Sequence, residues 1–72
     1  MRDARTVAAR YLTDGELLEE LRRAEADIDA AYWRFCRCAR AKPPVLEVPA
    51  AYQRRTECRR EASIRRLRPH TD

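Results

Sequence analysis

The sequence predicts an all-α fold in which an antiparallel helical hairpin dimerises into a four-helix bundle. Apolar residues recur at alternating spacings of four and three along the first half of the chain, as in a helix that is buried along one side. A proline-rich segment interrupts this pattern, and a second helical segment follows it. The 72 residues make one small domain. A core of this size supplies only about 3–5 kcal/mol, so a second chain is expected to complete it.

The first element is an N-terminal arm over residues 1–12. Its residues Val7, Ala8, Tyr11 and Leu12 are apolar at positions one turn apart, which is typical of a short amphipathic helix. The same residues would also suit an arm that docks on another surface. The sequence leaves both alternatives open.

The long first helix begins with a clear N-terminal signal. Thr13 and Glu16 are three residues apart, so each side chain can accept the backbone amide of the other in a capping box. Leu12 can pack on Leu17 and fix the entry of the chain. No helix breaker occurs before Pro43. The sequence therefore predicts a helix from about residue 14 to residue 41.

The heptad stripe of this helix predicts a coiled-coil contact. Its members are Leu17, Leu21, Ala24, Ile28, Ala31, Phe35 and Cys38. We expect the four largest of them to form a self-association seam between two copies of the chain, namely Leu17, Leu21, Ile28 and Phe35. Tyr32 lies on an adjoining stripe and widens this face, so three or four helices are expected around it.

A connector is predicted over residues 42–48, since Pro43, Pro44 and Pro49 argue against a helix there. Pro49 itself suits the first position of the following helix.

The second helix is predicted from about residue 50 to residue 67, because Pro69 ends it. Its apolar face is poor, so it cannot cover the first helix alone. A further helix, from the arm or from a second chain, is therefore expected. The hairpin as a whole spans residues 13–68, and residues 69–72 form a tail.

The charges of the two helices are complementary in the predicted register. A connector of about seven residues makes the helices antiparallel neighbours, and residues whose numbers sum to about 91 or 92 should lie side by side. Residues 13–29 carry a net charge of −5 and would face Arg65, Arg66 and Arg68. Each exposed pair contributes only a few tenths of a kcal/mol, but opposite charges also favour the antiparallel arrangement.

The other end of the hairpin is basic and is predicted to bind an acidic partner. Residues 30–60 carry a net charge of +6, and no acidic stretch is expected beside them. Such a patch attracts an acidic surface of a larger protein or, alternatively, the phosphates of a nucleic acid. The side chains could instead cover apolar surface with their stems and leave their charges in water. The basic residues are Arg34, Arg37, Arg40, Lys42, Arg54, Arg55, Arg59 and Arg60.

Trp33 is predicted to belong to the same binding surface. At 100° per residue it points away from the heptad stripe and towards Arg37. Trp flanked by Arg is typical of the residues that dominate binding energy at interfaces. The alternatives are that the arm or a second copy covers Trp33, or that bases stack on it. We therefore include it with the eight basic residues as predicted partner-binding residues.

The cysteines do not predict a metal site. Cys36 and Cys38 point in different directions on a helix, and His70 lies at the far end of the hairpin. A disulfide from either residue to Cys58 would staple the hairpin, and the alternative is that all three thiols act as small apolar side chains. No metal and no cofactor are expected.

Catalysis has no support in the sequence. There is one His, Ser63 is the only Ser, and one Gly excludes a Gly-rich phosphate loop. The carboxylates of Glu16, Glu19 and Glu20 are explained by the positive end of the helix dipole. The sequence therefore predicts a protein that is not an enzyme.

The chain is expected to be cytoplasmic and to have no membrane partner. No apolar run approaches the ~18–20 residues that span a bilayer, and charges interrupt the N-terminal residues where a signal peptide would be apolar. The architecture resembles that of small dimeric helical-hairpin regulators, among them the RNA-binding Rop-type bundles, in pattern alone. The sequence thus predicts a small non-catalytic interaction module or regulator, with a nucleic-acid-binding hairpin as the alternative.

Overall fold

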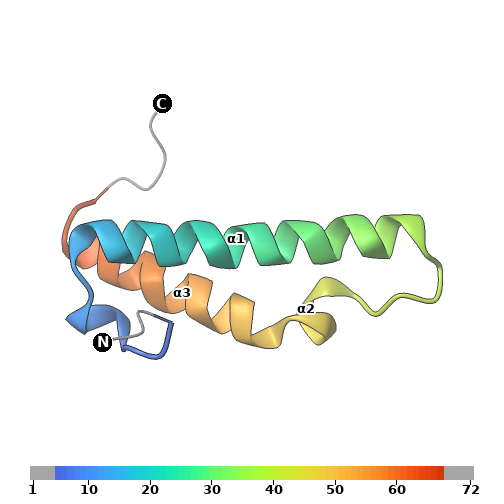
Figure 1. Cartoon of the computed structure of the whole chain (residues 1–72), viewed down its shortest axis with the longest axis horizontal. Helices are drawn as coiled ribbons and strands as arrows, with labels where there is room; N and C mark the ends of the chain where they lie inside the picture. The colour runs from blue at the N-terminus through green and yellow to red at the C-terminus, as the bar shows by residue number, and fades with distance from the viewer. Residues whose placement is uncertain (1–4, 68–72) are drawn as a thin grey trace.

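The computed structural model describes residues 5–67 and shows two long helices packed side by side and antiparallel (Figure 1). They are α1 (Asp14–Arg37) and α3 (Pro49–Ile64), with a single-turn helix α2 (Pro44–Glu47) between them and a 3₁₀ turn η1 (Ala9–Tyr11) before them. Residues 5–67 contain no strand. The predicted all-α hairpin is therefore confirmed, and the molecule is an elongated slab of 40 × 32 × 17 Å.

The capping box at the start of α1 forms as the sequence predicts. The Glu16 amide donates to the Thr13 hydroxyl at 3.2 Å, and the Thr13 amide donates to the Glu16 carboxylate at 2.9 Å. These two bonds satisfy amides that have no partner within the helix. Thr13 is extended, so the chain enters α1 with a sharp change of direction.

The α1 helix ends at Arg37, about one turn earlier than predicted. Cys38 is extended, with φ −134° and ψ 114°, although its amide still donates to the Arg34 carbonyl. The Ala41 amide then donates to the Cys38 carbonyl at 3.0 Å and closes a turn. This turn sends the chain back along α1.

The connector contains the helix α2, so the prediction that its prolines exclude helix is wrong. Pro44 occupies the first turn of α2, where a helix makes no use of the missing amide. Pro43 precedes the helix in extended conformation, and its carbonyl accepts the amides of Leu46 and Glu47. Proline is unfavourable inside a helix but favourable at its beginning.

The α3 helix begins at Pro49, as expected, and ends at Ile64, three residues earlier than predicted. Arg66 adopts the left-handed conformation, with φ 59°. The Leu67 amide donates to the Ala62 carbonyl and the Arg66 amide to the Ser63 carbonyl, which together form a Schellman motif. The motif turns Leu67 back onto the core, against which it is partly buried.

The core lies between α1, α3 and the arm. Its larger members are Leu12, Leu17, Leu21 and Cys58, each at most 3% exposed. Smaller members are Ala9 and Ala62, and Val7 and Leu67 pack at the edge. The arm therefore supplies the additional cover that the sequence requires for α1. Association with a second chain stays a prediction.

Polar contacts also hold the arm in place. The Ala9 amide donates to the Glu57 carboxylate at 2.7 Å. The Arg65 guanidinium donates to the carbonyls of Ala9 and Arg10 at 3.3 and 3.2 Å, and to Asp14 at 2.9 Å. Of the two alternatives for the arm, the short amphipathic helix is present only as the single turn η1. The rest of the described arm docks on α3 as irregular chain.

The register between the helices differs from the predicted one. That prediction places Glu25 opposite Arg66 or Leu67, whereas Glu25 pairs with Arg59 at 2.9 Å. The physical reason is that the turn after α1 and the helix α2 lead the chain back along α1 before α3 begins. The C-terminal turns of α1 consequently extend past α3, with α2 and the non-helical part of the connector beside them (Figure 1).

Candidate functional site

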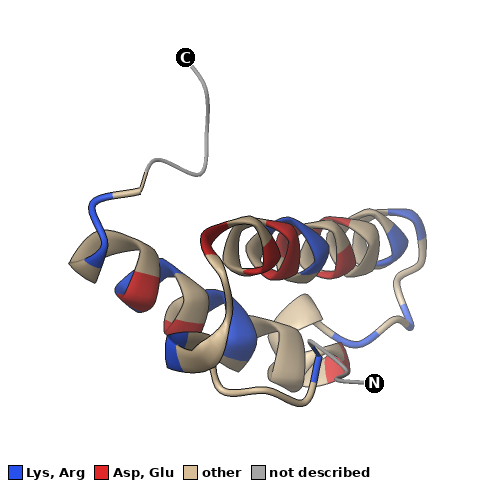
Figure 2. Ribbon diagram, turned by 60° about the vertical axis from the view of Figure 1, so that its left-hand side comes forward, with Lys and Arg blue, Asp and Glu red and all other residues tan. Residues whose placement is uncertain are grey.

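Three of the eight predicted basic residues are held by acidic side chains of the same chain. Arg34 pairs with Glu47 at 2.7 Å, Arg54 with Glu20 at 3.2 Å, and Arg59 with Glu25 at 2.9 Å. The expectation that no acidic stretch lies beside the basic end is therefore wrong for α3. The register shift is the reason, because it brings the start of α3 against the acidic half of α1. Figure 2 shows this acidic half and the basic end of α1.

The other five basic residues separate into two groups. Arg37, Arg40 and Lys42 are exposed at the end of α1 and in the turn after it, and no ion pair within residues 5–67 involves them. Arg55 lies 5.0 Å over the Tyr52 ring, as in a cation–π contact. Arg60 is exposed on α3. The structure thus does not gather all eight at one site.

Three exposed aromatic side chains lie in the last turns of α1, just before this first group along the chain. Tyr32, Trp33 and Phe35 are 51%, 56% and 40% exposed. The rings of Tyr32 and Trp33 meet edge to face, with 5.9 Å between their centroids. A hydrogen bond to Cys36 raises the pKa of the Tyr32 hydroxyl. The expectation that Trp33 points away from the buried face agrees with its exposure, whereas Phe35 was expected in the core.

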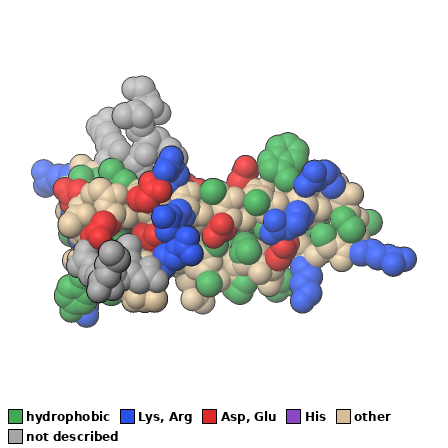
Figure 3. Space-filling view, in the orientation of Figure 1, with side chains coloured by type: hydrophobic (Ala, Val, Ile, Leu, Met, Phe, Trp, Pro, Cys, Tyr) green, Lys and Arg blue, Asp and Glu red, His purple; other side chains and the backbone are tan. Residues whose placement is uncertain are grey.

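Two further apolar side chains belong to this end of the molecule and were missed by the sequence reasoning. Val45 and Leu46 lie on α2 and are 54% and 64% exposed. The sequence feature that could have indicated this helix was Pro44, because proline is favourable in the first turn of a helix. Figure 3 shows hydrophobic and basic side chains interleaved where α1 ends. We name this region the distal surface: Tyr32, Trp33, Phe35, Arg37, Arg40, Lys42, Val45 and Leu46.

Phe35 is exposed because α3 does not reach the last turns of α1, whereas Trp33 lies on the side of α1 that faces away from the core. Phe35 continues the heptad stripe of Leu17 and Leu21, which are fully buried by α3 and the arm. Ile28, midway along the stripe, is half-buried. Ala31 is again fully buried, and only Phe35 and Cys38, the last two members of the stripe, are exposed. Leu17 and Leu21, predicted as part of a self-association seam, are occupied within a single chain.

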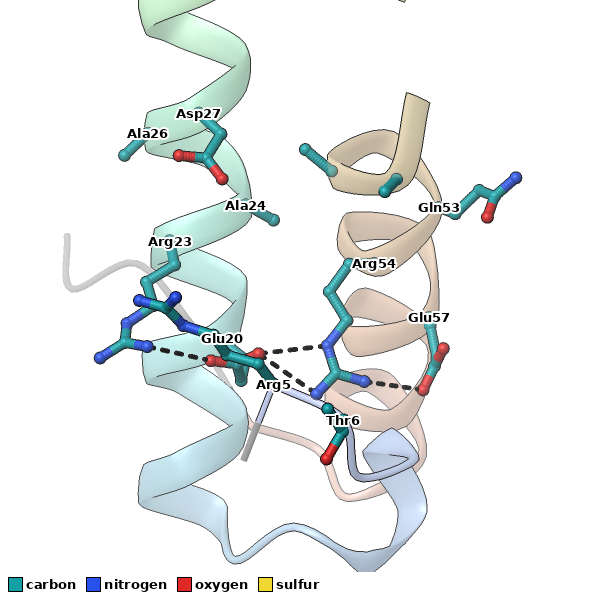
Figure 4. Close-up of a pocket in the computed structure, with 12 residues that line it drawn as sticks. Arg5, Thr6, Glu20, Arg23, Ala24, Ala26, Asp27, Gln53, Arg54 and Glu57 are labelled. Atoms are coloured by element: carbon teal, nitrogen blue, oxygen red, sulfur yellow. Dashed lines mark hydrogen bonds and ion pairs between the residues drawn. The ribbon is translucent and has the colours of Figure 1, made fainter. Parts of the chain in front are cut away.

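A groove of about 720 Å³ separates α1 from the first turns of α3 (Figure 4). Ala24 and Ala51 line its apolar part. Glu20 closes one end, with one carboxylate oxygen 3.2 Å from Arg54 and the other 3.7 Å from Arg23. Glu20 is only 5% exposed, so its charge depends on these partners. The Arg54–Glu20 ion pair links α1 to α3 across this groove.

The cysteines are free and do not form the disulfide considered above. Cys36 and Cys38 are exposed at the distal end, whereas Cys58 is buried in the core. Burial raises the pKa of the Cys58 thiol. Residues 5–67 contain no group of three or more side chains that could hold a metal ion, and His70 lies outside the described residues. Cys58 acts as a small apolar side chain.

No protein-family model, curated protein or solved structure matches this chain. Within the part of the chain that the structure describes, no helix is both long and apolar enough to cross a membrane.

Proposed function

We propose that this chain is a small non-catalytic interaction module or regulator that binds an acidic surface of a larger protein through its distal surface. The proposal rests chiefly on one observation. Exposed aromatic rings, Trp33 above all, occupy the same end of α1 as Arg37, Arg40 and Lys42, which form no ion pair within residues 5–67.

The aromatic side chains provide the affinity in this proposal. A buried aromatic anchor contributes far more binding energy than an exposed ion pair, and Trp, Tyr and Arg are the residue types enriched among such anchors. Trp33 is the strongest candidate, because more than half of its surface is accessible in the single chain. The surrounding cations select an acidic partner and accelerate its approach.

The nucleic-acid alternative has weaker support. Phosphate binding depends on the number of cations that can reach the backbone, and Arg34, Arg54 and Arg59 already pair with carboxylates. The remaining cations also lie in two separate groups. We therefore expect no tight duplex binding at physiological salt.

An affinity-capture experiment tests the proposal. The tagged chain should retain a specific acidic protein from the cells of its host, and Trp33→Ala should lose that protein. Ile64→Ala is a matched control, because Ile64 is also a large exposed apolar residue, 70% exposed, but lies at the opposite end of α3. Equal capture by the parent and Trp33→Ala, or the loss of capture in Ile64→Ala alone, would contradict the proposal.

A second titration separates the two partner classes. Labelled duplex DNA and RNA should bind weakly, and their affinity should fall steeply as salt rises. Sub-micromolar duplex binding at physiological salt, with a log–log slope of several units, would favour the nucleic-acid alternative over an acidic protein.

A further inference from the structure

The face of α1 opposite the core carries a second stripe of residues that are three or four positions apart. Its six members lie within about 80° of one another at 100° per residue, on the side away from Leu17 and Leu21. All are exposed except Glu19, which is partly exposed. We name it the outer stripe: Glu19, Arg22, Ala26, Ala30, Trp33 and Arg37.

The outer stripe is complementary to itself when it is reversed. Glu19 and Arg37 lie equally far from Ile28 on either side, and so do Ala26 and Ala30. In an antiparallel pair of α1 helices centred near Ile28, each Glu19 would therefore meet the Arg37 of the other copy. A parallel pair would instead place like residues together, with Arg37 against Arg37.

The centre of the stripe permits close approach of two helices. Ala26 and Ala30 are exposed and present only methyl groups, so each Ala26 can lie against Ala30 of the second copy. Trp33 would then lie one residue from the level of Arg22 of the second copy, where a guanidinium can stack on the indole ring. The Arg22 side chain is 77% exposed and pairs with Glu19 of the same chain at 2.7 Å, so the Glu19–Arg22 pair as a whole would meet Trp33 and Arg37 of the second copy.

We propose that two copies of this chain form an antiparallel, two-fold symmetric dimer through the outer stripe, held by reciprocal contacts between Glu19 and Arg37. The heptad seam is not available for this role, since Leu17 and Leu21 are already buried by α3 and the arm. A two-fold contact uses the same patch on both copies and closes on itself, so it gives dimers rather than filaments. The hydrogen bond from Arg22 lowers the pKa of the Glu19 carboxyl below its ordinary value, so the carboxylate carries its charge at neutral pH as an ordinary glutamate does.

The dimer does not depend on the proposed function, but it shares residues with it. Trp33 and Arg37 belong to both the outer stripe and the distal surface. Self-association therefore covers the partner-binding anchor, and the dimer and the partner complex exclude each other. The interface is a single pair of helices, which is small for a stable complex, so the dimer should form in the micromolar range or above.

Charge reversal with mixing tests the proposal. Light scattering and sedimentation from low micromolar to several hundred micromolar should take the parent from 8.5 kDa towards twice that mass. Glu19→Arg and Arg37→Glu should each stay monomeric, because each places like charges opposite one another. An equimolar mixture of the two variants should associate again, because every pair in the mixed dimer then has opposite signs.

Two controls make the outcome unambiguous. Circular dichroism must show that both variants retain parental helix content. Asp27→Arg changes the charge of α1 equally but lies outside the outer stripe, so it should associate like the parent. Trp33 is the only tryptophan, and its fluorescence should shift to shorter wavelength as the parent associates.

A parent that remains monomeric throughout would overturn the proposal. So would variants that associate as well as the parent does, or a mixture that fails to associate when the parent succeeds. The last result would show that Glu19 and Arg37 do not meet each other across the interface.

Discussion

Replacement of Arg54 by alanine should destabilise the fold more than any other single loss of an ion pair. Arg54 bridges Glu20 and Glu57 at 3.2 and 3.1 Å. Its removal leaves the Glu20 carboxylate, whose side chain is 6% exposed, with Arg23 at 3.7 Å. An ionised group that is buried without a close partner is costly, because water no longer solvates it.

The magnitude follows from the burial of the pair. Removing one partner of a fully buried ion pair costs about 3–5 kcal/mol. The Arg54 side chain is 17% exposed and Arg23 remains nearby, so we expect a smaller loss of about 2–3 kcal/mol. A chain of this size has only about 3–5 kcal/mol of stability in total. The variant should therefore lie close to its unfolding transition in water.

Urea unfolding followed by circular dichroism measures this loss. With an m-value of about 1 kcal/mol per molar, the urea midpoint of Arg54→Ala should fall by about 2–3 M. Glu20→Ala combined with Arg54→Ala should lose no more than Arg54→Ala alone, because the unpaired carboxylate is then absent. Arg22→Ala breaks an exposed pair with Glu19 and should unfold like the parent. An Arg54→Ala midpoint equal to that of Arg22→Ala would refute the reasoning.

Three further predictions concern the arm, the core thiol and the end of α3. Leu12→Ala should lower the free energy of unfolding in urea by about 2–3 kcal/mol, because Leu12 is 3% exposed. Tyr11→Ala replaces a side chain that is 61% exposed and should change this free energy little. Equal urea midpoints for the two variants would exclude a core role for the arm. The raised pKa of Cys58 favours the neutral thiol in the fold. Its contribution should be complete below the ordinary thiol pKa and lost as pH rises through the raised value, so the parent should lose more stability at alkaline pH than Cys58→Ala does. Arg66→Gly should stabilise the chain by about 0.5–1 kcal/mol, because glycine adopts φ 59° without strain; a lower melting temperature would contradict the assigned motif.

The local features of the fold were predictable from the sequence. Thr13 and Glu16 identify the start of α1, because a capping box depends only on residues three apart. Leu17 and Leu21 were correctly placed on the buried face by their spacing. Pro49 was correctly assigned to the start of α3.

The features that depend on the path of the connector were not predictable in the same way. Pro44 can either break a helix or begin one, and the sequence pattern does not distinguish the two. Because α2 forms, the chain runs back along α1 and shifts the register of α3. That shift pairs Arg54 and Arg59 with Glu20 and Glu25 instead of leaving them free.

The distal surface was predictable only in part. Trp33 and Arg37 were identified from the sequence, because position on a helix decides their direction, whereas Arg40 and Lys42 lie in the turn after α1. The exposure of Phe35 was not, since it depends on where α3 begins relative to α1. A heptad stripe shows which side of a helix can be buried, but not how far along the helix a partner extends.

The central claim is that this chain makes its contacts through the end of α1 around Trp33. In-cell photo-crosslinking at position 33 tests this claim most directly. A benzophenone amino acid would replace Trp33 in one variant and Ile64 in the control, both exposed apolar positions. We expect the variant at position 33 to form a discrete adduct, with a larger protein or with a second copy of the chain, and the variant at position 64 to form none. Adducts at position 64 alone, or at neither position, would contradict it.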